Sequence, residues 1–204
     1  MDTTLFPTKG NLIATKHSLE LASMGFELLD KKRNILVREM MGLLDKAKEI
    51  QSQINETFAN AYMALQKANI TMGVISDIAN ATDIEDKLSI KFRSIMGVEI
   101  PIVSIKTDAV QIPFGMYTSN SMLDEAYISF IKVKHLCALL AEIENSVYYL
   151  ADAIKKTKKR ANALKNIIIP KYESTLKFIS DSLEEKDREE FTRLKVIKKR
   201  KTGL

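Results

Sequence analysis

The sequence predicts a mainly α-helical protein, a long antiparallel two-helix coiled coil with a short β-hairpin in its middle segment. Apolar residues recur at alternating spacings of three and four from Leu12 to Ala68, and again from Ala126 to Ile168. Between these stretches, residues 88–102 alternate apolar and polar with a period of two. The first spacing is typical of a left-handed coiled-coil seam, and the second is typical of a β-strand.

The first seam continues for about eight heptads, which is far longer than a compact domain needs. Only Thr15, Arg33 and Thr57 are polar in it. Thr8, after Pro7, is placed to cap the helix start, so we expect one helix over residues 8–77. The Arg33 side chain can leave the seam toward solvent, or it can face a third partner.

A helix of this kind must cover its seam, and the second apolar stretch supplies the cover if the chain folds back antiparallel. Burial contributes about 25 cal/mol per Å² of apolar surface, so two matched seams can hold the pair together. The candidate seam residues are Leu19, Phe26, Leu29, Leu36, Leu43 and Ile50 in the first helix and Leu136, Leu140, Ile143, Val147, Leu150 and Ile154 in the second.

Residues 80–120 are expected to form the hairpin and a connector. The strands lie on either side of Ser94–Gly97, where glycine suits a turn, and Pro101 restricts the second strand to a sheet edge. Residues 108–120 are predicted to be an extended connection. The candidate residues of the hairpin surface are Ile90, Phe92, Met96, Gly97, Val98 and Pro101.

The second helix is predicted over residues 121–198, starting at a capping-box pattern of Ser121 and Asp124. Pro170 lacks a backbone donor, so we expect the helix either to kink near Ile167–Pro170 or to be broken there. It shifts the seam to Tyr172, Leu176, Ile179, Leu183, Phe191 and Leu194. Glu184 with Arg188 and Glu189 with Arg193 are spaced to form ion pairs, and residues 195–204 are a basic tip.

Composition favours one elongated domain over residues 1–204 in a cytoplasmic setting. The chain is 46% hydrophobic and 28% charged, with a net charge of +5. The single cysteine, Cys137, has no internal disulfide partner, and we expect it to be a small buried apolar residue. The N-terminus does not resemble a signal peptide, and no apolar run reaches the roughly 20 residues of a membrane-spanning helix.

No motif for catalysis, cofactor binding or metal binding is found. The chain has no phosphate-binding glycine loop, no dinucleotide fingerprint and no zinc spacing, and His17 and His135 are isolated positions at the surface or the seam edge. The basic runs 155–160 and 195–201 can contact phosphates, but neither carries the interleaved aromatic residues that stack on bases. A nucleic-acid-binding arm therefore ranks below a structural coiled-coil adaptor or tether.

Four motifs in order resemble the D subunits of the V-type and archaeal A-type ATPases, over nearly the whole chain. The motif residues are Pro7, Thr8, Lys9 and Leu12 with Leu19, Ala22, Gly25, Leu28, Leu29, Lys31, Lys32 and Arg33; Met96, Gly97, Val98 and Pro101; Asn162, Ala163, Leu164 and Pro170; and Asp187, Arg188, Glu189, Glu190, Phe191, Arg193, Leu194 and Lys195. Asn34 stands where this family commonly has Asp, and Lys165-Asn166 stands where Glu and an aromatic residue are expected.

The resemblance implies a non-catalytic rotor shaft, peripheral to the membrane, that couples ATP hydrolysis or synthesis to proton or sodium transport. Its implied partners are the catalytic A and B subunits of the hexamer, the F subunit of the stalk and the C subunit, which docks on the membrane ring. The end carrying both termini would meet the hexamer, and the hairpin would face the stalk. The candidate hexamer contacts are Lys9, Arg188, Arg193, Lys195 and Lys198.

Overall fold

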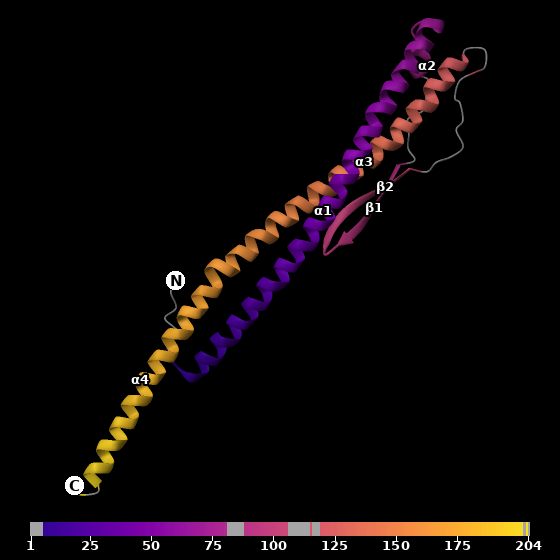
Figure 1. The fold of residues 1–204 in the computed structure, drawn as a ribbon. Helices are drawn as coiled ribbons and strands as arrows, with labels where there is room; N and C mark the ends of the chain where they lie inside the picture. Colours follow the sequence, from indigo (N-terminus) through magenta and orange to yellow (C-terminus); the bar gives the residue numbers. More distant parts are fainter. Residues whose placement is uncertain (1–5, 81–87, 106–114, 116–118, 202, 204) are drawn as a thin grey trace. The chain divides into compact units, whose positions relative to one another are not determined.

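The structure is a computed structural model that describes residues 6–80, 88–105, 115, 119–201 and 203, without the side chains of Asp77 and Ala79. Its elements follow in the order α1 (Lys9–Met72), α2 (Ser76–Asn80), β1 (Leu88–Ile95), β2 (Val98–Ile105), α3 (Ser121–Ala163), η1 (Leu164–Ile168) and α4 (Ile169–Lys201), as Figure 1 shows. The mainly α-helical fold with a hairpin between two long helical segments is confirmed. Most of the connection predicted at 108–120 lies outside the described residues.

Helix α1 begins and ends where local chemistry favours it. The Thr8 hydroxyl accepts a hydrogen bond from the backbone N–H of Asn11 at 3.2 Å, which confirms Thr8 as the cap. At the other end Gly73 has a φ of 79°, and its N–H donates to the Asn69 carbonyl at 2.9 Å. Because glycine adopts positive φ readily, α1 ends at Met72 rather than at the expected residue 77.

The hairpin is a two-stranded antiparallel sheet closed by a two-residue turn. Ile95 pairs with Val98, and Phe92 pairs with Pro101 farther along. Met96 and Gly97 have φ values of 51° and 76°, the pair of positive values that a type I′ turn requires. The turn is thus shorter than the Ser94–Gly97 segment that the sequence predicts, because β1 continues through Ile95.

Helix α3 starts at Ser121, as predicted, but its cap lies one residue before the predicted capping box. The Asn120 carbonyl accepts hydrogen bonds from the N–H groups of Leu123 at 2.8 Å and Asp124 at 3.2 Å, so Asn120 stands at the cap position. After α3 comes the π-helix η1, in which the N–H of Ile169 donates to the carbonyl of Leu164. Pro170, the second residue of α4, then follows directly on η1 and has no N–H to donate to the preceding turn.

The chain divides into two compact units, whose boundaries fall inside α1 and α3. Residues 1–34 and 155–204 form unit 1, and residues 35–154 form unit 2. In unit 2, Leu36 packs with Leu150, and Tyr62 contacts Phe130. In unit 1, a Cβ added to Gly25 would lie 3.8 Å from Cδ1 of Leu164. Unit 1 also has a contact between Lys186 and the Pro7 carbonyl. In both units, a contact earlier in the first helix pairs with one later in the second, so the helices run antiparallel within each unit.

Candidate functional site

The buried centre of unit 2 joins both helices to the hairpin. Leu36 of α1 and Leu150 of α3 are 0% exposed, and Ile100 of β2 packs with them. Partly buried apolar residues from all three elements surround this group. They are Met40, Leu43, Ile95, Val98, Ala153 and Ile154. The hairpin is therefore fixed to the helix pair by an apolar core, which no local sequence pattern indicates.

The twelve candidate seam residues all lie buried or half-buried in their own units. Leu36, Ile143 and Leu150 are buried, and the remaining nine are half-buried. In unit 2 the seam also contains Ala61, Ala64 and Ala68, which are nearly inaccessible. Small side chains of this kind allow two helix backbones to approach closely. Whether these residues transmit torque stays a prediction.

Arg33 does not face a described partner across the seam. Its guanidinium forms an ion pair with Asp30 at 2.7 Å and donates to the Asn34 side-chain oxygen at 3.1 Å. The Asn34 amide nitrogen in turn donates to Asp30 at 3.3 Å. The side chain thus bends along its own helix and remains about one-third exposed, which agrees with the expectation that its charged head leaves the seam.

Two polar residues of α3 bind the outer edge of β2. Glu142 Oε2 accepts a hydrogen bond from the Val103 N–H at 2.7 Å. The Ser146 hydroxyl donates to the Pro101 carbonyl at 3.5 Å. The two are spaced four residues apart on α3, so they lie on one face of the helix. Sequence reasoning missed both, because a polar residue beside a seam looks like ordinary surface until the hairpin is seen to lie against it.

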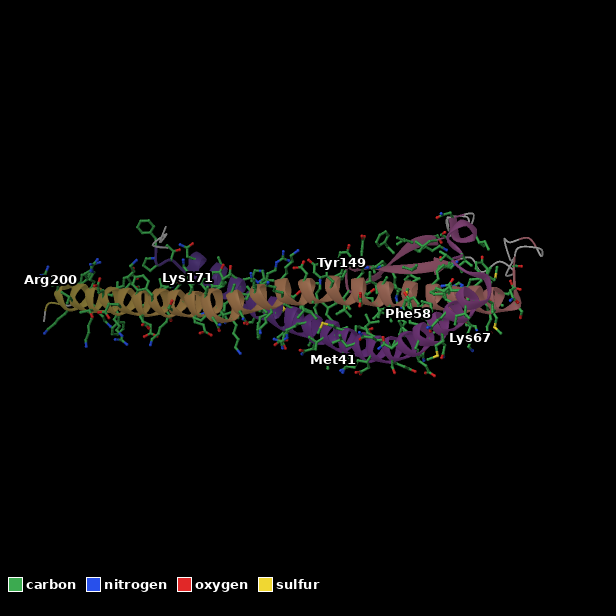
Figure 2. All side chains as sticks on the ribbon, turned by 90° about the horizontal axis from the view of Figure 1, so that it is seen from above. Met41, Phe58, Lys67, Tyr149, Lys171 and Arg200 are labelled. Carbon is green, nitrogen blue, oxygen red and sulfur yellow. The ribbon has the colours of Figure 1, made fainter. Side chains whose placement is uncertain are left out.

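A groove of about 350 Å³ lies between the hairpin and α3. It is lined by Leu88, Ile90, Phe92, Pro101, Val103, Ala138, Ala141, Glu142, Asn145 and Tyr149. Tyr149 is on the hairpin side of α3, whereas Met41 lies on an outer surface of α1, as Figure 2 shows. Of the six predicted hairpin residues, Ile90, Phe92 and Pro101 line this groove, Met96 and Gly97 form the turn, and Val98 packs on the core.

In unit 1, contacts between the helices persist along η1 and the first part of α4. The Lys165 ammonium lies 5.5 Å from the centre of the Phe26 ring, a cation–π contact at one of the positions where the sequence departs from its family resemblance. Ile179 is fully buried. Farther on, Lys186 Nζ donates to the Pro7 carbonyl at 3.4 Å, close to the start of α1.

The last turns of α4 expose the seam residues predicted there. Phe191 is 69% exposed and Leu194 is 65% exposed, so their assignment to the seam is wrong. The reason is that α1 starts at Lys9, and the Pro7 carbonyl already meets Lys186. In unit 1 no α1 residue remains for the later turns to pack against.

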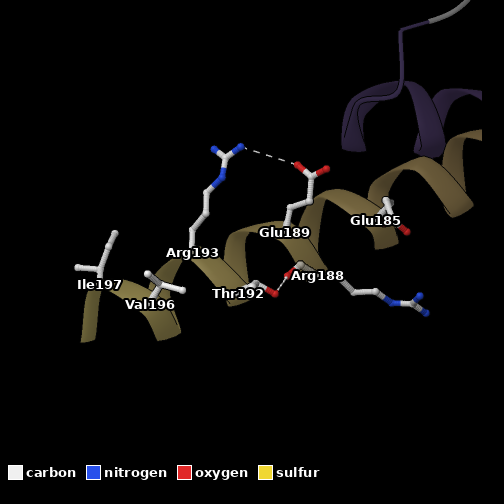
Figure 3. A pocket seen from close by; sticks show the side chains of 7 residues that line it. All are labelled: Glu185, Arg188, Glu189, Thr192, Arg193, Val196 and Ile197. Carbon is white, nitrogen blue, oxygen red and sulfur yellow. Dashed lines mark hydrogen bonds and ion pairs between the residues drawn. The ribbon is translucent and has the colours of Figure 1, made fainter. Parts of the chain in front are cut away.

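Charged side chains surround these exposed apolar residues. The two predicted ion pairs are confirmed, Arg188 with Glu184 at 3.5 Å and Arg193 with Glu189 at 3.9 Å. Figure 3 shows the Arg193–Glu189 pair beside a shallow groove that also includes Val196 and Ile197. The five candidate hexamer contacts, Lys9, Arg188, Arg193, Lys195 and Lys198, are all exposed. Exposed charge around apolar residues is typical of a surface that binds another protein.

The prediction for the single thiol is wrong. Cys137 is exposed rather than buried, because it follows the seam residue Leu136 and points away from the seam. His17 is exposed and His135 half-buried, as expected of surface or seam-edge positions. Within the described part of the chain, no group of three or more His, Cys, Asp or Glu residues could hold a metal ion.

These features describe a mainly helical protein with exposed apolar and charged residues at the end of α4. A family model for the D subunit of ATP synthases matches residues 11–199. The chain belongs to the ATP synthase D-subunit family. Its relatives include D subunits of V-type and A-type ATP synthases.

Individual relatives cover almost the whole chain. The D subunit of the V-type ATP synthase from Thermotoga neapolitana is 47% identical over 196 residues, 95% of this chain and 97% of the relative. The D subunit of the A-type ATP synthase from Thermococcus kodakarensis is 36% identical, with 94% and 92% covered. Its counterpart from Methanopyrus kandleri is 35% identical, with 94% and 84% covered. Among the described residues, no helix is long and apolar enough to cross a membrane.

Proposed function

We propose that this chain is the non-catalytic rotor shaft of a V/A-type ATPase, peripheral to the membrane on its cytoplasmic side. Its role is to transmit torque between ATP hydrolysis or synthesis in the A/B hexamer and proton or sodium transport through the membrane ring. Membership of the D-subunit family carries the proposal. The antiparallel helix pair within each unit supports it, because two helices that brace each other resist twisting better than one.

The proposed contacts follow the two groups of exposed residues. The charged surface of Lys9, Arg188, Arg193, Lys195 and Lys198 would meet the lining of the A/B hexamer, where the exposed apolar residues of α4 would also lie. The hairpin residues would face the stalk, near its F subunit and the ring-docking C subunit. As the shaft turns, each catalytic site would meet a different face of it, and this difference would bias the state of the site.

The direct test is coexpression with the A and B subunits. A rotor must join the hexamer at a single copy per hexamer, which size-exclusion chromatography and native mass spectrometry will measure. Failure to co-elute, or a stoichiometry that matches the number of A subunits, would contradict the proposal.

A cross-linking experiment separates a rotor from a static adaptor. A photoreactive amino acid replaces Arg193, and illumination of the assembled complex links it covalently to the hexamer. A rotor tied to its stator stops, so ATP turnover falls in proportion to the linked fraction. The same replacement at exposed Met41, which lies in unit 2, is the control for photodamage. Unchanged turnover in a fully linked Arg193 sample would favour the adaptor.

A further inference from the structure

The two edges of the hairpin carry different sets of backbone groups. In a hairpin with a two-residue turn, the residues beside the turn form a hydrogen-bonded pair, and such pairs then alternate with open ones. Ile95 and Val98 flank the turn, so the Ile90–Val103 and Phe92–Pro101 pairs are open ones. The N–H and C=O groups of these open pairs point outward, away from the other strand.

The outward edge of β2 is already closed. Val103 donates its N–H to Glu142 Oε2 at 2.7 Å, and the Pro101 carbonyl accepts from Ser146 at 3.5 Å. Pro101 has no N–H to satisfy, and proline is a common way of blocking a strand edge. Both contacts agree with the alternation of hydrogen-bonded and open pairs. Val103 and Pro101 belong to open pairs, so their backbone groups point away from β1.

The outward edge of β1 is open. Within the described part of the chain, β1 pairs with β2 alone. The outward backbone groups of β1 belong to Leu88, Ile90, Phe92 and Ser94. The three apolar side chains in this set are 47%, 56% and 66% exposed, although they line the groove against α3. An unpaired edge beside exposed apolar side chains is a template for another strand.

Charge decides which strand fits. Lys91 and Arg93 lie on the opposite face of β1 from Ile90 and Phe92, and both are exposed. If a second copy of the chain paired antiparallel through the same edge in a register centred on Lys91 or Phe92, Lys91 would meet Lys91 or Arg93 of that copy. Like charges directly opposite each other destabilise a sheet, so self-pairing is disfavoured. A strand with acidic residues at those positions would be attracted instead.

We propose that the open edge of β1 binds an extended segment of another protein as a third strand, antiparallel to β1. The segment alternates apolar residues, which extend the face of Leu88, Ile90 and Phe92, with acidic residues, which lie opposite Lys91 and Arg93. This site does not depend on the proposed rotor role, because the hairpin and the face of α3 beside it form it.

The test uses the full chain and the peptide acetyl-VEVEVEV-amide, followed by NMR titration and amide hydrogen exchange. We expect binding with a Kd below about 1 mM, and slower exchange of the Ile90 and Phe92 amides. The peptide acetyl-VKVKVKV-amide should bind at least about tenfold more weakly, because it places lysine opposite Lys91 and Arg93. Absence of binding by the acidic peptide, or equal binding of the two peptides, would overturn the proposal.

Hydrogen bonding between the two backbones is tested by matched changes in β1 and in the peptide. Ile90→Pro removes the outward N–H of residue 90 but none of the hydrogen bonds between β1 and β2, so it should raise the Kd of the acidic peptide at least about tenfold. Ile90→Val keeps this N–H, and its Kd should lie within about twofold of the wild-type value. N-methylation of the inner valines of the peptide should abolish binding, and N-methylation of its glutamates should not. Protection of the Lys91 amide in Ile90→Pro will show that the hairpin is intact. Equal binding by the proline and valine variants would overturn the proposal.

Discussion

Met96 occupies a backbone conformation that suits a different residue type. Its φ of 51° lies in the left-handed region, where side chains other than Gly, Asn and Asp are disfavoured by roughly 1–2 kcal/mol. A methionine in the first turn position is therefore held there by the turn and by the packing of Ile95 and Val98 on the core. The hairpin tip stores a small amount of strain.

Met96→Asn should stabilise the hairpin, because asparagine tolerates this conformation and is preferred in type I′ turns. We expect the free energy of hairpin opening to rise by about 0.5–1 kcal/mol, measured by hydrogen exchange of the Lys91 and Arg93 amides. Gly97→Ala is the opposing control and should lower it, since Gly97 has a φ of 76°. Faster exchange in Met96→Asn would contradict the strain argument.

Arg33 interrupts an apolar seam with a local ion pair that contributes little. Exposed pairs of this kind are worth at most about 1 kcal/mol, whereas a leucine at a seam position buries apolar area. Arg33→Leu should therefore raise the free energy of unfolding by about 1 kcal/mol, measured by urea denaturation. Asp30→Asn, which weakens the ion pair alone, should change it by less than about 0.5 kcal/mol. Destabilisation by Arg33→Leu would show that the seam needs the charge.

At the scale of elements, the contact between Leu36 and Leu150 holds the two helices of unit 2 together. Leu36→Asp with Leu150→Asp places two like charges at positions that are fully buried, at a cost of several kcal/mol. We expect the helix pair to separate, with loss of helical circular dichroism and of coupled ATP turnover in the assembled complex. Met41→Asp with Leu139→Asp, at exposed positions on the same helices, is the control. Normal coupled turnover in the buried double variant would argue against a torque-bearing seam.

The π-helix η1 explains how the seam passes Pro170. Leu164 and Tyr172 are both half-buried although they are eight residues apart, where two α-helical turns take about seven. A π-turn takes roughly one residue more than an α-turn, so both side chains stay on one side. Wider turns also move the preceding carbonyls away from the Pro170 ring.

Removing that extra residue should restore an ordinary helix. Deletion of exposed Asn166 together with Pro170→Ala should leave the midpoint of thermal unfolding unchanged or higher, because the seam keeps its phase. Deletion of exposed Glu173 instead turns every later seam residue, Ile179 included, by about 100° and should lower the midpoint by several degrees. Circular dichroism against temperature compares the two. If both deletions lowered the midpoint of thermal unfolding equally, the π-turn would not be what keeps the seam residues on one side of the helix.

Elements with strong periodicity were predictable, and contacts between distant elements were not. The seam spacing led to α1 and α3, and the alternation in residues 88–102 led to the hairpin. The contact of Glu142 and Ser146 with β2 depends on how the hairpin folds back onto α3, and no local spacing encodes that. Phe191 and Leu194 continue the apolar pattern, yet they are exposed because the partner helix ends first.

For the whole molecule, the charge is concentrated at the C-terminal end. Residues 195–204 contain five Lys and Arg residues and no Asp or Glu, so their removal takes the net charge from +5 to zero. If these cations meet the hexamer, truncation after Leu194 should weaken assembly with A and B, and most strongly at low salt. Size-exclusion chromatography at two ionic strengths measures this. Replacing all five with glutamine is the matched control, and its assembly should fall to the same degree.

Exposure of the one thiol on α3 offers a practical advantage. Since Cys137 is the single cysteine of the sequence and is accessible, a maleimide fluorophore will attach at one defined position without prior removal of other thiols. A dye with two attachment arms, the second on a cysteine introduced at exposed Glu144, would fix its transition dipole to the helix surface. Polarised single-molecule fluorescence of the immobilised complex would then record the angular position of the chain during ATP turnover, in steps if it rotates and as a constant signal if it does not.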